Sequence, residues 1–155
     1  MYNRYAESSR VNWFRHHGRH APPEEKQKWD NLVTPRGIGL ILRSITTNYK
    51  LPLTFPDKVI VLHKLAEKPT LMSDHLKLEA LIISKNHMRI AATCWEDNVI
   101  YDYRLGARAH LERDMAERLA GAWDYQESKR AHHLEQVSAI DKACKELERE
   151  VGIQG

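Results

Sequence analysis

The spacing of apolar residues predicts helices over most of the chain. A first helix is expected at about 23–33, because Pro22 and Pro23 suit a first helical turn, and a second at about 36–49. Pro56-Asp57 opens a third helix, which stops before Pro69. The second helix carries apolar residues at helical spacing, namely Ile38, Ile41, Leu42 and Ile45.

The stretch from 70 to 104 allows two interpretations. Runs rich in Val, Ile and Tyr are compatible with a short antiparallel meander at 58–103, which would make the fold α+β. The turns between these runs lack the Gly that tight hairpins prefer, whereas Ser73, Asp74, Asn86 and Asp97 suit helix N-caps. We therefore expect helices at 75–84, at 87–94 and from 98 onward, and keep the meander as the alternative.

A long C-terminal helix is the clearest feature of the pattern. Its last part carries Val137, Ile140, Cys144, Leu147 and Val151, spaced as the a and d positions of a coiled coil. We expect this seam to pack on a neighbour or to support a homo-oligomer through 137–151. The predicted fold is mainly α: a basic arm at 1–22, a helical domain at 23–127 with a helix-turn-helix at about 75–111, and a C-terminal helix at 128–155.

The excess positive charge of the chain lies in its N-terminal arm. Among 155 residues the formal net charge is +3, and the arm accounts for it, with Glu7 set against Arg4, Arg10, Arg15 and Arg19. The chain contains two Cys and has no long apolar stretch or signal-like start, which excludes a disulfide-rich or membrane protein and predicts a cytoplasmic one. We expect no metal at His16, His17 and His20, where the nearby Arg residues repel a cation.

Three segments carry a resemblance. They are 78–83 (Leu-Glu-Ala-Leu-Ile-Ile), 86–91 (Asn-His-Met-Arg-Ile-Ala) and 100–111 (Ile-Tyr-Asp-Tyr-Arg-Leu-Gly-Ala-Arg-Ala-His-Leu). Together they resemble the helix-turn-helix of sigma-factor region 4, and the chain is similar to the late antitermination (Q-type) proteins of lambdoid phages. The resemblance implies a DNA-binding transcription regulator in the cytoplasm of a bacterial host, with double-stranded DNA and RNA polymerase as partners.

The helix-turn-helix would contact DNA through two sets of side chains. Lys85 and Arg89 would neutralise phosphates, and the second helix would present Asn98, Tyr101, Asp102, Arg104 and Arg108 to the DNA. The basic arm would add non-specific attraction. No catalytic constellation, cofactor or metal is expected. The alternative function is a small phage protein that modulates a host factor by protein contact.

Overall fold

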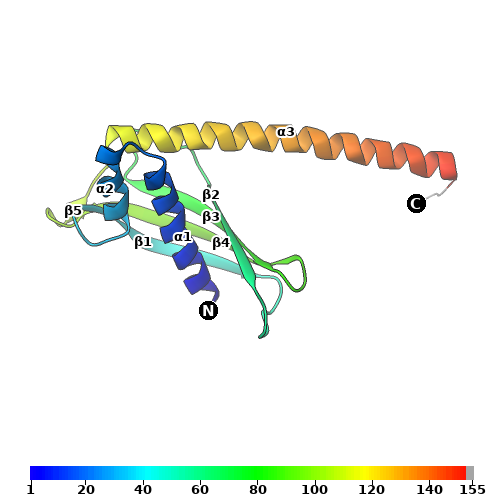
Figure 1. Cartoon of the computed structure of the whole chain (residues 1–155), viewed down its shortest axis with the longest axis horizontal. Helices are drawn as coiled ribbons and strands as arrows, with labels where there is room; N and C mark the ends of the chain where they lie inside the picture. The colour runs from blue at the N-terminus through cyan, green and yellow to red at the C-terminus, as the bar shows by residue number, and fades with distance from the viewer. Residues whose placement is uncertain (153–155) are drawn as a thin grey trace.

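The computed structural model describes residues 1–152, which form helices and one antiparallel sheet (Figure 1). In chain order the elements are α1 (Tyr2–Arg19), α2 (Pro23–Leu32), β1 (Ile38–Tyr49), β2 (Val59–Leu65), β3 (His75–Ser84), β4 (Arg89–Asp102), β5 (Ala107–Arg108) and α3 (Arg113–Val151). The strand order is β1-β4-β3-β2, and the short β5 pairs with β4.

Helix α1 lies across one face of the sheet (Figure 1). Alternate residues of β3 point toward it and are buried, as a period of two requires: Leu76, Leu78, Ala80, Ile82 and Ser84. Phe14 of α1 and Trp29 of α2 have no exposed surface and pack in the same core. The core therefore lies between the two N-terminal helices and the sheet.

The expectation of a mainly α fold is wrong. The helix expected at 36–49 is strand β1, and the third helix falls on a loop and β2. The proposed helix-turn-helix at 75–111 is occupied by β3, β4 and β5. The meander at 58–103 lies closer to the structure, although its last two runs form a single strand, β4. Short apolar runs do not distinguish a strand from a buried helix, and here the sheet decides.

Side chains replace the missing Gly in the turn between β3 and β4. The Ser84 hydroxyl donates to Asp57 Oδ2 over 2.6 Å, and the Asn86 amide donates to Asp57 Oδ1 over 3.1 Å. The Ser84 hydrogen bond lowers the pKa of Asp57, so the carboxylate stays charged and holds the turn. Met88 takes the positive φ of 51° that Gly would otherwise supply.

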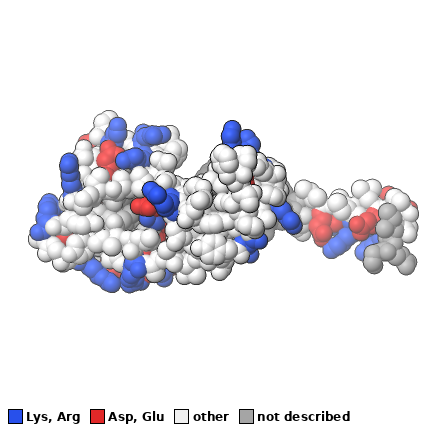
Figure 2. Space-filling model, turned by 90° about the horizontal axis from the view of Figure 1, so that it is seen from below, with Lys and Arg blue, Asp and Glu red and all other residues white. Residues whose placement is uncertain are grey.

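Helix α3 is anchored only at its beginning. Met115, Ala116 and Leu119 are buried, and Gln126 forms hydrogen bonds with both the amide and the carbonyl of Leu65. Beyond this point every residue from 128 to 151 is exposed, and the helix extends past the sheet (Figures 1 and 2). We call residues 128–151 the overhang. None of the helices within residues 1–152 is long and apolar enough to cross a membrane.

Candidate functional site

A buried ion pair joins α1 to the middle of the sheet. Arg10 Nη1 lies 2.8 Å from Glu96 Oε1, and the two side chains are 12% and 0% exposed. Both residues sit on the facing sides of their elements, Arg10 on α1 and Glu96 on β4. Charges buried to this degree are tolerated only when paired, so the sheet fixes α1 at this point.

The ion pair continues into a chain of polar groups. His63 Nε2 on β2 lies 3.4 Å from Glu96 Oε2, and His63 Nδ1 lies 2.9 Å from the Ser9 hydroxyl. The Ser9 hydroxyl also donates to the Val61 carbonyl over 3.4 Å, so this chain of polar groups ties α1 to β2 as well as to β4. The side chains of His63 and Glu96 have no exposed surface, so a substrate cannot reach them. We therefore assign this buried cluster to positioning α1.

A cleft opens beside the buried cluster, between α1, α2 and the edge strand β1. Its volume is about 180 Å³. Seven of its twelve lining residues are apolar, and it holds one carboxylate, that of Glu7 on α1. The polar residues of the wall are Glu7, Arg10, Thr34, Asn98 and Tyr103.

Two local features of β1 shape this cleft. A register shift between Leu42 and Ser44 marks a bulge, and Leu40 and Leu42, which precede it, line the cleft. Gly39 admits the Tyr103 ring, because a Cβ there would lie 2.9 Å from Tyr103 Cε2. The edge strand therefore supplies the apolar wall and leaves room for the tyrosine.

Asn98 is an unusual member of the cleft. It is 1% exposed, and its Nδ2 donates to the Leu76 carbonyl over 3.4 Å. Its Oδ1 is buried and has no hydrogen-bond donor among residues 1–152. A buried amide oxygen without a donor is costly, and this oxygen lies behind the surface of the cleft rather than in it.

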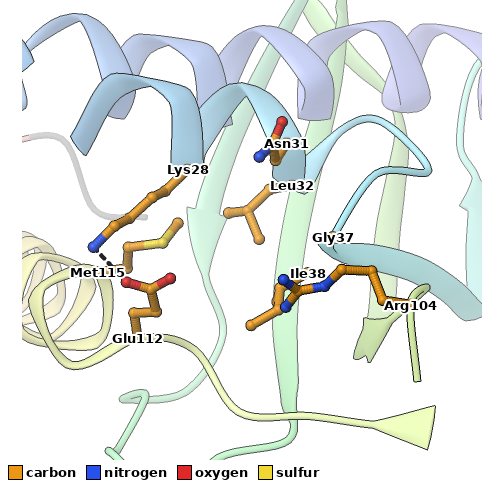
Figure 3. A pocket seen from close by; sticks show the side chains of 8 residues that line it. All are labelled: Lys28, Asn31, Leu32, Gly37, Ile38, Arg104, Glu112 and Met115. Carbon is orange, nitrogen blue, oxygen red and sulfur yellow. Dashed lines mark ion pairs between the residues drawn. The ribbon is translucent and has the colours of Figure 1, made fainter. Parts of the chain in front are cut away.

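A second cavity, of about 120 Å³, shares Leu32 with the cleft, and Figure 3 shows the side chains that line it. Lys28 points to Glu112 and also pairs with Asp114 at 3.0 Å, and these hydrogen bonds raise the pKa of Lys28. Arg104 pairs with Asp102 at 3.1 Å. Because each cation already has a carboxylate partner, this cavity ties α2 to the start of α3 rather than offering a free charge to a ligand.

The residues expected to bind DNA do not share a helix face. Lys85 lies in a turn, Arg104 and Arg108 pair with acids, and the others lie along β4: Arg89, Asn98, Tyr101 and Asp102. The arm is helix α1, on which Arg10 is largely buried while the others are exposed: Arg4, Arg15 and Arg19. Of both sets the cleft brings together only Arg10 and Asn98.

Sequence reasoning missed several residues of the site. It noted Glu7 only as the single acid of the arm, and it did not single out His63 or Glu96. The available signal was the spacing of Glu7 and Arg10, which places them on one face of a helix. Within residues 1–152 no three His, Cys, Asp or Glu side chains are arranged to hold a metal.

Comparison with known protein families gives one match. Residues 1–119 match the model of the thioesterase-like superfamily. No curated protein matches the sequence.

Solved structures are similar in fold. One is a DHNA-CoA thioesterase from Staphylococcus aureus, with 17% identity and a TM-score of 0.63 over 83% of this chain and 79% of that one. Another is a thioesterase from Thermus thermophilus complexed with coenzyme A and zinc, with 20% identity and a TM-score of 0.56 over 77% and 78% of the two chains. A third is a gentisyl-coenzyme A thioesterase, with 21% identity and a TM-score of 0.57 over 77% and 82%. The shared architecture is the hotdog fold, a sheet packed on a helix.

These findings correct the functional expectations. The resemblance to Q-type antitermination proteins is wrong, because the matched family covers α1 and the whole sheet and residues 1–152 form no helix-turn-helix. Double-stranded DNA and RNA polymerase are not supported as partners, and neither is a phage modulator of a host factor. The expectation of a protein without catalytic activity is overturned as well.

Proposed function

The chain belongs to the thioesterase-like superfamily, and from this premise we propose that it is an enzyme that hydrolyses acyl-coenzyme A thioesters in the cleft between α1 and β1. The observation that carries the proposal is that the family match includes every element that lines the cleft. Solved thioesterases of the same fold, one with coenzyme A bound, support the choice of substrate class.

The cleft has a wall suited to an acyl group. Phe14 of α1 and Leu40 and Leu42 of β1 line it. Burying an acyl chain there gains about 0.8 kcal/mol for each CH₂ group.

Glu7 supplies the chemistry in this proposal. Its carboxylate takes a proton from a water molecule, whose oxygen bonds to the thioester carbonyl carbon. The carbon–sulfur bond then breaks, and the proton passes from Glu7 to the departing thiolate. Arg10 lines the same cleft, but its guanidinium is already paired with Glu96, so its role is to hold α1, and with it Glu7, in place.

A substrate panel tests the proposal. The full chain is incubated with aliphatic and aromatic acyl-coenzyme A thioesters, and release of free thiol is followed with a thiol reagent. We expect hydrolysis of at least one class, with one carboxylic acid formed for each thiol. A folded protein that releases no thiol above background from any member of the panel contradicts the proposal.

A substitution in the cleft tests where the acyl group binds. Leu42→Trp fills the apolar wall, so we expect KM to rise most for the largest acyl groups and kcat to change little for small ones. Leu62→Trp is the matched control, because Leu62 is 52% exposed on β2 and does not line the cleft. Equal effects of the two substitutions on all substrates would place binding elsewhere.

A further inference from the structure

The overhang of α3 carries an apolar seam that no described part of the chain covers. Along it Val137 is 62% exposed, Ile140 64%, Leu147 59% and Val151 70%, and Cys144 is exposed between them. These residues occupy the a and d positions of two heptads. Single exposed apolar residues are ordinary, but an aligned row on a protruding helix is typical of a docking surface.

The charges of the overhang are sorted around this seam. The e and g positions, which flank it, carry Asp141, Glu148 and Glu150 and no basic residue between 134 and 151. The basic residues of this segment lie at the b and f positions of the outer faces, namely Lys142, Lys145 and Arg149. One pair, Lys145 and Asp141, is 2.8 Å apart but well exposed, so it neutralises the flank only weakly. The docking surface is therefore apolar with acidic borders.

These borders do not complement a second copy of the same helix. In a parallel, in-register pair the flanking contacts are Gln136 with Asp141 and Ala143 with Glu148, none of which joins opposite charges. In an antiparallel pair Asp141 faces Glu148, which is repulsive. The distribution of charge therefore argues against the expected self-association through 137–151.

We propose that the overhang docks an amphipathic helix of another protein, one with apolar a and d positions flanked by Lys or Arg. Such a helix would bury the seam and face the acidic borders with basic side chains. The seam runs from 137 to 151, about 21 Å at 1.5 Å per residue, and suits a partner helix of about two heptads. The inference does not depend on the proposed enzyme activity.

Two synthetic peptides test this directly. Both have Ile at a and Leu at d over about two heptads, and they differ only in having Lys or Glu at every e and g position. Binding of each fluorescent peptide to the full chain is measured by anisotropy. We expect the Lys peptide to bind at least about tenfold more tightly than the Glu peptide at low salt, and the difference to shrink as salt screens the charges.

Variants of the exposed helix keep the test specific. Ile140→Asp with Leu147→Asp should abolish binding of the Lys peptide, whereas Ala139→Asp, on the same helix but off the seam, should retain it. Glu148→Lys with Glu150→Lys should reverse the preference toward the Glu peptide. Circular dichroism confirms that each variant stays folded. The proposal is overturned if the two peptides bind equally, if neither binds, or if sedimentation shows a dimer that the Ile140/Leu147 double variant dissociates.

Discussion

Helix α1 and the overhang of α3 are both amphipathic, yet only one of them is covered. Helix α1 buries a charged residue, Arg10, beneath its contact with the sheet. The overhang leaves a cleaner apolar seam in water. The difference shows that a purely apolar helix face is not buried for that reason alone. What decides burial is whether another element offers a complementary surface, as β4 does with Glu96.

The largest expected effect comes from removing the charge on the carboxylate that holds α1. Glu96→Gln leaves the Arg10 guanidinium buried without an ionic partner, and we expect a loss of about 3–5 kcal/mol in the free energy of unfolding. Asp141→Asn makes the same change in the exposed pair of the overhang and should cost less than about 0.5 kcal/mol. Urea unfolding measures both. Equal losses would show that the buried Arg10–Glu96 pair stabilises the fold no more than the exposed Lys145–Asp141 pair does.

A glycine in α1 and one in α3 compare close packing with open space. Gly18 faces Trp29 so closely that an added Cβ would lie 2.7 Å from the Trp29 Cβ, so Gly18→Ala should cost about 1–3 kcal/mol. Gly121 in α3 has open space around it, and Gly121→Ala should stabilise the protein by about 0.5–1 kcal/mol through helix propensity. Thermal unfolding gives the sign of each change, and a stabilising Gly18→Ala would contradict the close packing of α1 on α2.

The pH dependence of stability gives a smaller effect. Burial, followed by the charges of His16 and Arg118, lowers the pKa of His17 to about 4 from 6.5. Between these values the unfolded chain binds a proton that the folded chain does not, so stability falls as pH drops from 6.5 to 4. We expect a contribution on the order of 1–2 kcal/mol, reduced by partial solvent screening.

Substitutions separate His17 from the other titrating groups. His17→Phe keeps the stacking on Trp29 and should flatten the fall in stability between pH 6.5 and 4. His133→Phe, in the exposed overhang, should leave the fall unchanged. Urea midpoints measured across this pH range give the comparison. If His17→Phe shows the same fall in stability as the unaltered protein, His17 is not the group responsible.

The sequence predicted some elements well and others not at all. The proline-led helix at 23–33 is present as α2, and the C-terminal helix predicted at 128–155 is present within α3 as far as Val151, while 153–155 lie outside the described residues. Caps, prolines and heptad spacing are local signals. The sheet was missed in the preferred interpretation, because β1 and β3 carry apolar runs that fit either period. Its strands are fixed by pairing with β4, which is a long-range effect.

The candidate site was even less accessible from the sequence. Arg10 and Glu96 lie far apart in the chain, and only the fold brings them to 2.8 Å. Glu7 and Asn98 meet in one cleft for the same reason. Charge counting identified a basic arm at 1–22 but could not show that it is a helix or that one of its Arg residues is buried. Residues that act together here are assembled by topology, which a single sequence does not display.

The most direct test of the account is the effect of Glu7→Gln on kcat, measured with the best acyl-coenzyme A substrate of the panel. The substitution keeps the shape of the side chain and removes the carboxylate that accepts the proton of water. The account predicts a fall of about 10²–10⁴-fold, with an unchanged circular dichroism spectrum and a normal rate for the matched control Glu24→Gln at an exposed position of α2. A Glu7→Gln enzyme that keeps its kcat to within about twofold would contradict it.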